Sequence, residues 1–467
     1  IGTGQHPAGI LLSDMDDISD YLPVFFNENS GKWLSQYDMT EVEQMGLLKI
    51  DFLELKTLDI LSSALRFLKC RGIEIDLENL PQDPDVFQKI FSSGQTTAVF
   101  QFESSGMRQL LQQFRPQTIE DLILILSIYR PGPIQYVQSI VQARNKNRQP
   151  IWSTPKLKEI LKDTYGYPVY QESIMRIFHE IAGVSIQETD HIRRAISKKK
   201  MDVLLDPRKD YQNRLISGLI QDGATRKQAE DFWIQILNFG QYAFSKSHAA
   251  VYAHLSYMTA YMKHHYPAAF MCAALIHADS TRTVQLLSEC LRMGVLILPP
   301  DINQSERNFS VCGDRQIRYG LAKIHGVGSA AVGIITERVN NGPFRSVKDF
   351  LLRGHKDCKV TNALIEAGAL DRWHNNRYIL KTAYLPVAED IRQYRYYQQA
   401  LETESGRKKE GLKEKMEFYR ERYLSAVFPM GTPESIEEKL REEKERLEIY
   451  VSGHPLAEYM DQLDKKV

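Results

Sequence analysis

The sequence predicts an α+β fold: a small β-rich N-terminal part, then a large helical part, then a smaller helical region around a glycine hairpin. Three observations lead to this prediction. Short apolar runs separated by Asp, Asn, Gly and Ser fill residues 1–60, which is typical of strands and turns. From about residue 58 apolar residues recur at helical spacing. Short strand-like runs interrupt the helices at residues 295–320.

The helical parts can be followed in order along the chain. The first helix is predicted over residues 57–72, with leucines at helical spacing and Gly72 at its end. Residues 73–290 are mostly helical, with proline-rich joints at residues 130–134 and 165–170. Residues 320–375 read as short helices joined by glycines, and residues 376–450 as long, charged helices.

Length and charge limit the function classes. A chain of 467 residues corresponds to roughly three domains. Lysine plus arginine equals aspartate plus glutamate, with 59 of each. A uniformly basic coat for nucleic acid is therefore excluded, but local basic patches are not.

Cysteine usage and hydropathy predict a cytoplasmic protein. No two of the five cysteines form a C-x-x-C pair, so a zinc or disulfide framework is not expected. No run of about 18 apolar residues could span a membrane. The first residue is Ile1 rather than Met, which suggests a segment of something longer.

One strand-like run carries both an ammonium and a carboxylate. In "LLKIDFL" (47–53), Lys49 and Asp51 alternate with Leu48, Ile50 and Phe52. Strand alternation places Lys49 and Asp51 on one face, and we expect the apolar residues of the other face to pack on a core. A surface salt bridge on an edge strand would explain this pattern. The functional alternative is a rigidly held metal-binding carboxylate.

A second run concentrates cations. "DHIRRAISKKK" (190–200) contains Arg193, Arg194, Lys198, Lys199 and Lys200 against one acid, Asp190. It is either a solvated basic helix end or a clamp for triphosphate or DNA phosphates. Adjacent helical residues diverge by about 100°, so we expect only one of the two arginines to face a given phosphate.

Two further motifs indicate phosphate contacts. Lys246, Ser247 and His248 stand at the predicted start of a long helix, where a phosphate is favoured, although Ser247 alone could be an N-cap. "KIHGVGSAAVGII" (323–335) has helix-hairpin-helix spacing. Lys323, Gly326 and Gly328 would bring backbone N–H groups to a DNA phosphate. A glycine turn between two core helices is the alternative.

The order of the motifs resembles that of a known family. The blocks "GLLKIDFLELKTLDIL", "TTAVFQFESSGM", "YRPGPI", "YQESIM", "IRRAISKKK", "YAFSKSHAAVYA", "LPPDIN" and "SGHPL" occur in the same order in the bacterial replicative DNA polymerase III alpha subunits, the C-family polymerases. The resemblance runs from about His6 to Leu456. It implies a palm remnant at residues 1–60, helical fingers at 61–290, strands plus a helix-hairpin-helix region at 291–375, and a charged helical region at 376–467 leading to an absent oligonucleotide-binding domain.

The resemblance also implies roles for single residues. Asp51 would be the third metal-binding aspartate of the palm, holding Mg²⁺, and Lys49 its neighbouring active-site lysine. The cations Arg193, Arg194, Lys198 and Lys199 would face the incoming nucleotide, as would Lys246, Ser247 and His248. Ser245 replaces the usual asparagine of that last motif, and Glu54 replaces a usual glycine.

The activity implied is template-directed nucleotidyl transfer from dNTPs to a primer 3′-hydroxyl by two-metal catalysis. Partners would be primer-template DNA, dNTPs, a sliding clamp and other replisome subunits. The family's paired upstream aspartates are absent, and we interpret Asp14 and Asp16 as surface-loop residues. We therefore expect this chain alone not to polymerise. "QYRYY" (393–397) is a poor copy of the clamp peptide. A decayed DNA-binding paralogue and a helix-hairpin-helix nuclease or repair protein remain alternatives.

Overall fold

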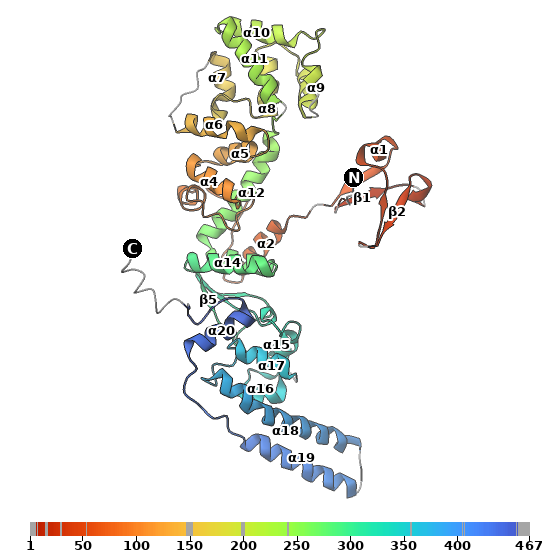
Figure 1. Cartoon of the computed structure of the whole chain (residues 1–467), viewed down its shortest axis with the longest axis vertical. Coiled ribbons are helices and arrows are strands. Elements are labelled where there is room, and N and C mark those ends of the chain that lie inside the picture. The colour runs from red at the N-terminus through yellow and green to blue at the C-terminus, as the bar shows by residue number, and fades with distance from the viewer. Residues whose placement is uncertain are drawn as a thin grey trace, which may run out of the picture. The chain divides into compact units, whose positions relative to one another are not determined.

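The structure is a computed structural model with two compact units, Ile1–Asp59 and Ile60–Val467 (Figure 1). The residues that the structure describes are 6, 8–14, 17–28, 30–52, 54–145, 153–197, 201–240, 242–354, 357–403, 405, 407–453 and 455. The α+β fold class predicted from the sequence is confirmed, because small sheets accompany a predominantly helical chain.

The N-terminal unit contains two antiparallel two-stranded sheets. One joins β1 (Gly9–Leu12) to β4 (Leu48–Asp51), and the other joins β2 (Val24–Asn27) to β3 (Lys32–Ser35). The short helices between them are η1 (Ile18–Asp20) and α1 (Met39–Gln44). Asp38 and Glu41 form a reciprocal capping box at the start of α1, which satisfies backbone donors at that helix end.

The prediction for the two faces of β4 was half wrong. The side chains alternate as expected, but the apolar face is not buried within this unit: Leu48 is 60% exposed and Phe52 66%. The Lys49 face is the one that turns inward. Its cross-strand partner Leu11 packs against the small core formed by Leu22, Val42 and Leu47.

Helix α2 (Lys56–Lys69) agrees with the first predicted helix. Leu61 and Leu68 are buried on one face, and Gly72 follows with a positive φ of 74°. Such a conformation costs glycine little and is frequent just beyond helix ends.

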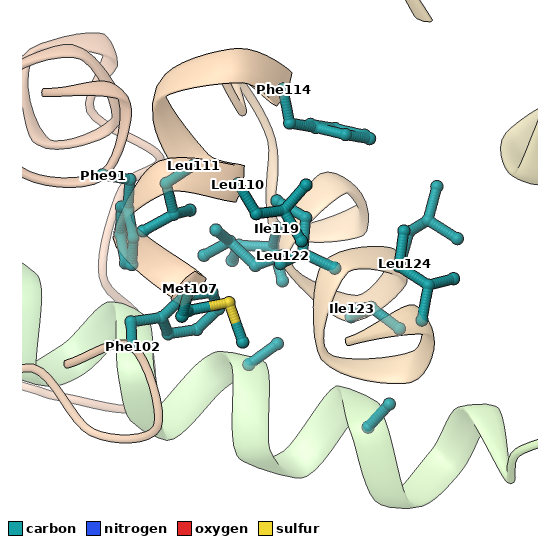
Figure 2. Close-up of a cluster of buried hydrophobic side chains, with 14 of the residues drawn as sticks. Phe91, Phe102, Met107, Leu110, Leu111, Phe114, Ile119, Leu122, Ile123 and Leu124 are labelled. Carbon is teal, nitrogen blue, oxygen red and sulfur yellow. The ribbon is translucent and has the colours of Figure 1, made fainter. Parts of the chain in front are cut away.

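The first core of the large unit surrounds α5 (Ile119–Ile128). This helix packs along α12 (Lys246–His265), and Figure 2 shows the α5 side chains Ile119 and Leu122 meeting Leu110 and Leu111 of a neighbouring helix. Helix α5 is apolar on nearly all sides, and a helix of this kind is stable only when other elements surround it. The flanking elements are α3 (Pro84–Val86), the π-helical turn η2 (Phe87–Ser92), α4 (Ser105–Phe114), η3 (Pro133–Tyr136) and α6 (Val137–Arg144).

A second core lies among the next helices and includes Phe178, Tyr211 and Trp233. Helix α8 packs on both α7 and α9, and α10 packs on α11. The elements are α7 (Pro155–Leu161), η4 (Lys162–Thr164), α8 (Gln171–Glu180), α9 (Ile186–Ser197), η5 (Met201–Val203), α10 (Tyr211–Gln221) and α11 (Arg226–Gly240).

A small mixed sheet follows α13 (Pro267–Ile276) and α14 (Ser280–Arg292). Its strand order is β5-β7-β6, with β5 (Leu296–Leu298) parallel to β7 (Gln316–Arg318) and β6 (Ser310–Gly313) antiparallel to it. The strands predicted at residues 295–320 are thereby confirmed. Helix α13 contacts β6 and β7, and α14 contacts β5.

The last part of the chain is helical. Helices α18 and α19 pack side by side as a long hairpin (Figure 1). The elements are η6 (Leu321–Lys323), α15 (Ala330–Asn341), α16 (Val347–Arg353), α17 (Cys358–Glu366), α18 (Arg377–Thr403), α19 (Arg407–Ser425) and α20 (Ile436–Leu447). None of the described helices has both the length and the apolar character needed to cross a membrane.

Candidate functional site

In the N-terminal unit, β4 brings Lys49 and Asp51 together as predicted. The Lys49 Nζ lies 3.1 Å from Asp51 Oδ1, and the Lys49 side chain is only 17% exposed. His6 adds a third group, with its Nδ1 3.8 Å from Asp51 Oδ1. The carboxylate is therefore flanked by a lysine and a histidine.

Gly9 makes room for this group. Gly9 pairs directly with Asp51 across the β1–β4 sheet. A Cβ at position 9 would lie 2.9 Å from Lys49 Cε, 3.0 Å from His6 Nδ1 and 3.2 Å from Asp51 Oδ1. The three side chains can approach one another because this position carries no side chain.

Asp51 supplies only one ligand toward the Mg²⁺ implied by the resemblance. Its oxygen donor suits magnesium, but two-ion catalysis needs further carboxylates. Among the described residues, the one group of three or more potential ligands that could hold a metal ion is Asp83, His264 and His265, and it does not include Asp51. At the position that the resemblance assigns to Mg²⁺, the described residues therefore place one carboxylate, Asp51, and no cluster of potential ligands.

On α9, Arg193 and Arg194 bind the same carboxylate. An Arg193 nitrogen lies 2.8 Å from Asp190 Oδ1, and an Arg194 nitrogen lies 2.8 Å from Asp190 Oδ2. The hydrogen bond from Arg193, more than any other contact, lowers the pKa of Asp190. Both arginines reach Asp190 because it precedes them by three and four residues and so lies on the helix face that they share. That only one of the two faces a given phosphate stays a prediction. Lys198, Lys199 and Lys200 lie outside the described residues.

At the start of α12 a carboxylate, Glu172, occupies the helix terminus. The backbone N–H of Lys246 donates to Glu172 Oε1 and Oε2, at 3.0 and 2.9 Å. Ser245 is the N-cap residue, and its hydroxyl lies 2.8 Å from that of Ser247. Ser247 is thus inside the helix rather than at its cap, and the terminus predicted to bind phosphate already has an anion beside it.

A short backbone bridge holds the two segments together. Tyr170 and Phe244 form a parallel bridge, in which the N–H of Gln171 donates to the Phe244 carbonyl at 3.0 Å. The Lys246 ammonium lies over the Tyr170 ring at 5.3 Å. His248 instead contacts the Phe244 ring edge-on, at 5.4 Å between centroids. Lys246 and His248 therefore contact different rings, Tyr170 and Phe244 respectively.

The glycine hairpin forms between η6 and α15. Gly326 and Gly328 both have positive φ, 94° and 49°, as a tight turn requires. A Cβ on Gly326 would lie 3.3 Å from both Ala363 Cβ and Arg446 Nη1, whereas one on Gly328 would enter open space. The α20 residue Arg446 closes the turn, because its carbonyl accepts from the His325 N–H at 2.9 Å. Both glycines are exposed, but only Gly328 has open space where a side chain would point.

Sequence reasoning missed three residues near these sites. His6 and Glu172 lie inside the quoted motif region, but nothing in their local pattern indicates contact with residues 45 or more positions away. Arg130 belongs to "YRPGPI", whose prolines and glycine were interpreted only as a helix stop. Its guanidinium lies 4.0 Å from the centroid of Phe244.

Comparison with known families agrees with these features. A model described as the bacterial DNA polymerase III alpha subunit finger domain matches residues 57–218. A bacterial DNA polymerase III alpha NTPase domain model matches residues 2–54, and a helix-hairpin-helix motif model matches residues 294–380. In chain order, these matches define the class of protein as a bacterial DNA polymerase subunit.

Curated relatives extend the match to nearly the whole chain. The DNA polymerase III subunit alpha of Thermus aquaticus is 36% identical over 97% of this chain and 36% of its own length. Those of Aquifex aeolicus and of Neisseria meningitidis serogroup B are 34% and 38% identical, over 98% and 99% of this chain and 37% and 39% of their own lengths. The chain belongs to the family of bacterial DNA polymerase III alpha subunits, and it spans less than two fifths of the length of these relatives.

Proposed function

We propose that this chain is part of a bacterial replicative DNA-directed DNA polymerase, which transfers nucleotides from dNTPs to a primer 3′-hydroxyl under the direction of a template. The observation that carries the proposal is the succession of two DNA polymerase III alpha matches and one helix-hairpin-helix match along one chain. The four-part division at residues 60, 290 and 375 is part of the same proposal.

In this proposal, Asp51 is an oxygen ligand for Mg²⁺, and Lys49 balances its charge. The bound metal would lower the charge on the reacting phosphate. Lys49 orients the Asp51 carboxylate through the 3.1 Å contact, and Gly9 leaves the space in which the groups meet.

Arg193 and Arg194 are the proposed fingers cations near the triphosphate, where a phosphate oxygen would replace Asp190 as the partner of the guanidinium that faces it. Both guanidinium groups hold Asp190, and a triphosphate offers more charge and more acceptor oxygens than one carboxylate. Lys198, Lys199, Lys246, Ser247 and His248 are the further proposed nucleotide contacts. Lys323, Gly326 and Gly328 are proposed to contact the DNA backbone without reading its sequence.

The remaining partners belong to the same proposal. A sliding clamp and other replisome subunits would bind the polymerase, and the location would be the cytoplasm. The weak clamp-peptide copy at 393–397 lies within the continuous helix α18, so it does not support a clamp contact there.

A non-catalytic DNA-binding role is the second candidate. One observation favours it: the described residues place a single carboxylate, Asp51, at the candidate centre. The two candidates differ in whether Asp51 is needed for chemistry or only for local charge balance.

Primer extension by the full-length gene product that carries this sequence distinguishes the candidates. Asp51→Asn keeps the side-chain volume and removes the charge, and we expect extension to fall to background while DNA binding is kept. Asp14→Asn is the matched control, because Asp14 lies outside the strands, and it should leave extension unchanged. Parent-like extension by Asp51→Asn, or no extension by the parent, would overturn the polymerase proposal.

A further inference from the structure

Three potential metal ligands meet where the C-terminal end of α12 approaches the start of α3. They are Asp83, His264 and His265, and their ligand atoms all lie within 4.8 Å of one another. His265 Nε2 lies 2.9 Å from Asp83 Oδ2, although the two residues are 182 positions apart in the sequence. The group therefore exists only through the tertiary fold.

The carboxylate of Asp83 is positioned before any ligand binds. Asp83 is the N-cap residue of α3, and its Oδ1 accepts from the Asp85 N–H at 2.8 Å. Its own N–H donates to the Tyr257 hydroxyl at 2.7 Å, and that hydroxyl donates to the Pro81 carbonyl at 2.7 Å. Oδ1 thus caps α3 while Oδ2 is directed at the end of α12. Ligands that hydrogen bonds already orient make stronger metal sites.

Both histidines stand in the last turn of α12. Adjacent residues of a helix point about 100° apart, so two neighbouring histidines do not ordinarily share a partner. Here the two rings meet edge-on, with 4.8 Å between their centroids, and the His265 ring also packs against Tyr261 at 4.3 Å. The C-terminal end of a helix favours a cation. The end of α12 therefore presents two imidazoles to Asp83 at a place where the backbone itself favours positive charge.

The donor set indicates which metal fits. Imidazole nitrogens with a carboxylate oxygen suit zinc, whereas Mg²⁺ is bound mainly through oxygen. Zinc bonds to such donors are about 2.0–2.1 Å long, so the ligand atoms of a tetrahedral site lie about 3.3 Å apart. The 2.9 Å between Asp83 and His265 is close to that spacing. These two side chains are 27% and 32% exposed, so an ion from solvent reaches them.

An ion pair between Asp83 and His265 is the simpler explanation for the 2.9 Å contact. It does not use His264, and it requires a charged ring beside a second imidazole, which like-charge repulsion disfavours when both are protonated. Lys89 does not supply the missing charge to Asp83, because it pairs with Asp85 at 2.8 Å. A bound divalent cation uses all three groups and leaves both rings neutral.

We propose that Asp83, His264 and His265 bind a zinc ion, with water in its fourth position. The ion would tie the segment that precedes α3 to the end of α12, and so would stabilise the packing of α3 and η2 against that helix. The site goes beyond the proposed polymerase function, because it shares no residue with those proposed to bind Mg²⁺, nucleotide or DNA.

Calorimetric titration with Zn²⁺ alone tests the site on this 467-residue chain, prepared without a histidine tag. The parent should bind a zinc ion that millimolar Mg²⁺ does not displace. Only the folded state holds the three ligands together, so saturating zinc should raise the unfolding temperature by about 3 °C or more.

His264→Gln separates a zinc site from an ion pair. It leaves the contact between Asp83 and His265 in place, so the unfolding temperature without zinc should stay that of the parent. Zinc affinity should fall by about tenfold or more, and the stabilisation by zinc should be lost. His254→Gln is the matched control, because His254 is exposed on the same helix, about 16 Å from His265 by helical rise. It should bind zinc like the parent.

Two results would overturn the zinc site. One is parent-like zinc affinity and stabilisation in His264→Gln, which would leave only an ion pair between Asp83 and His265. The other is no zinc bound by the folded parent at submillimolar Zn²⁺. Neither measurement involves dNTP, DNA or Asp51, so the extension assay judges the polymerase proposal separately.

Discussion

The carboxylate of Glu172 lies at the first turn of α12 and accepts twice from the backbone N–H of Lys246, at 3.0 and 2.9 Å. Glu172 is near the start of α8, so its side chain joins the beginnings of two helices although Glu172 and Lys246 are 74 residues apart in the sequence. A negative charge is stabilising at such a terminus. The same charge opposes any phosphate that approaches Lys246.

Glu172→Gln should separate these two effects. The amide keeps one acceptor but loses the charge, so the free energy of unfolding should fall by about 0.5–1.5 kcal/mol. Nucleotide affinity should rise, because the repelling carboxylate is gone. Urea unfolding and titration with fluorescent dATP measure the two quantities. Glu159→Gln, an exposed change on α7, is the control, and lower affinity in Glu172→Gln would contradict the prediction.

Gly9→Ala should disturb the candidate centre more than the fold. The new Cβ would meet the mobile ends of Lys49 and His6, which can move away, so we expect a stability loss of only about 1 kcal/mol or less. Primer extension by the full-length gene product should nevertheless fall, since the contacts to Asp51 must change. Gly333→Ala, where a Cβ meets nothing within 4 Å, is the control. Full extension by Gly9→Ala would show that this close approach is unimportant.

The two hairpin glycines should respond differently to substitution. Gly326→Ala adds a Cβ close to Ala363 and Arg446 at a φ of 94°, so it should destabilise the large unit by about 1–2 kcal/mol. Gly328→Asn suits a φ of 49° and enters open space, so the fold should be kept. Its side chain would nevertheless block a DNA phosphate, and binding to duplex DNA should weaken equally for all sequences.

Fluorescence anisotropy at several salt concentrations checks the hairpin prediction. The parent should bind duplex DNA less tightly as salt rises, because phosphate contacts release counterions. A Gly328→Asn protein that binds as tightly as the parent would remove the hairpin from the DNA interface.

Lys263 should give the stability of the large unit a measurable pH dependence. Burial lowers the pKa of Lys263 to about 8, below the value of about 10.4 for an unfolded chain. Between these values the unfolded state binds more protons, so the free energy of unfolding attributable to Lys263 should rise from pH 8 to about pH 10. Urea titrations of the parent and of Lys263→Met should therefore diverge over that window.

The same variant should also be less stable at pH 7. Lys263 is fully buried and lies 2.5 Å from Glu289, so Lys263→Met should cost about 2–4 kcal/mol. Lys89→Met, which removes an exposed pair with Asp85, should change stability by about 0.5 kcal/mol or less. Equal effects of the two changes would show that the buried Lys263–Glu289 pair contributes no more to stability than the exposed Lys89–Asp85 pair.

Local pattern was enough for much of the secondary structure. The helix ending before Gly72, the strands at residues 295–320 and the long helix beginning at Lys246 all follow from periodicity, turn residues and caps. The pairing of Lys49 with Asp51 was also predictable, because strand alternation alone puts two residues of one strand on one face. These features depend on neighbours within a few residues, which a sequence displays directly.

Contacts between distant segments were decided only by the tertiary structure. The motifs indicate the polymerase family, but nothing local joins Glu172 to Lys246, Arg130 to Phe244 or Lys263 to Thr97. Which face of β4 turns inward was also undecidable, because burial of Leu48 or Lys49 depends on what packs against the sheet. The local sequence pattern determines which helices and strands form, whereas tertiary packing determines which side chains meet. Burial and ion pairing depend on neighbours that lie close in space and far apart in sequence.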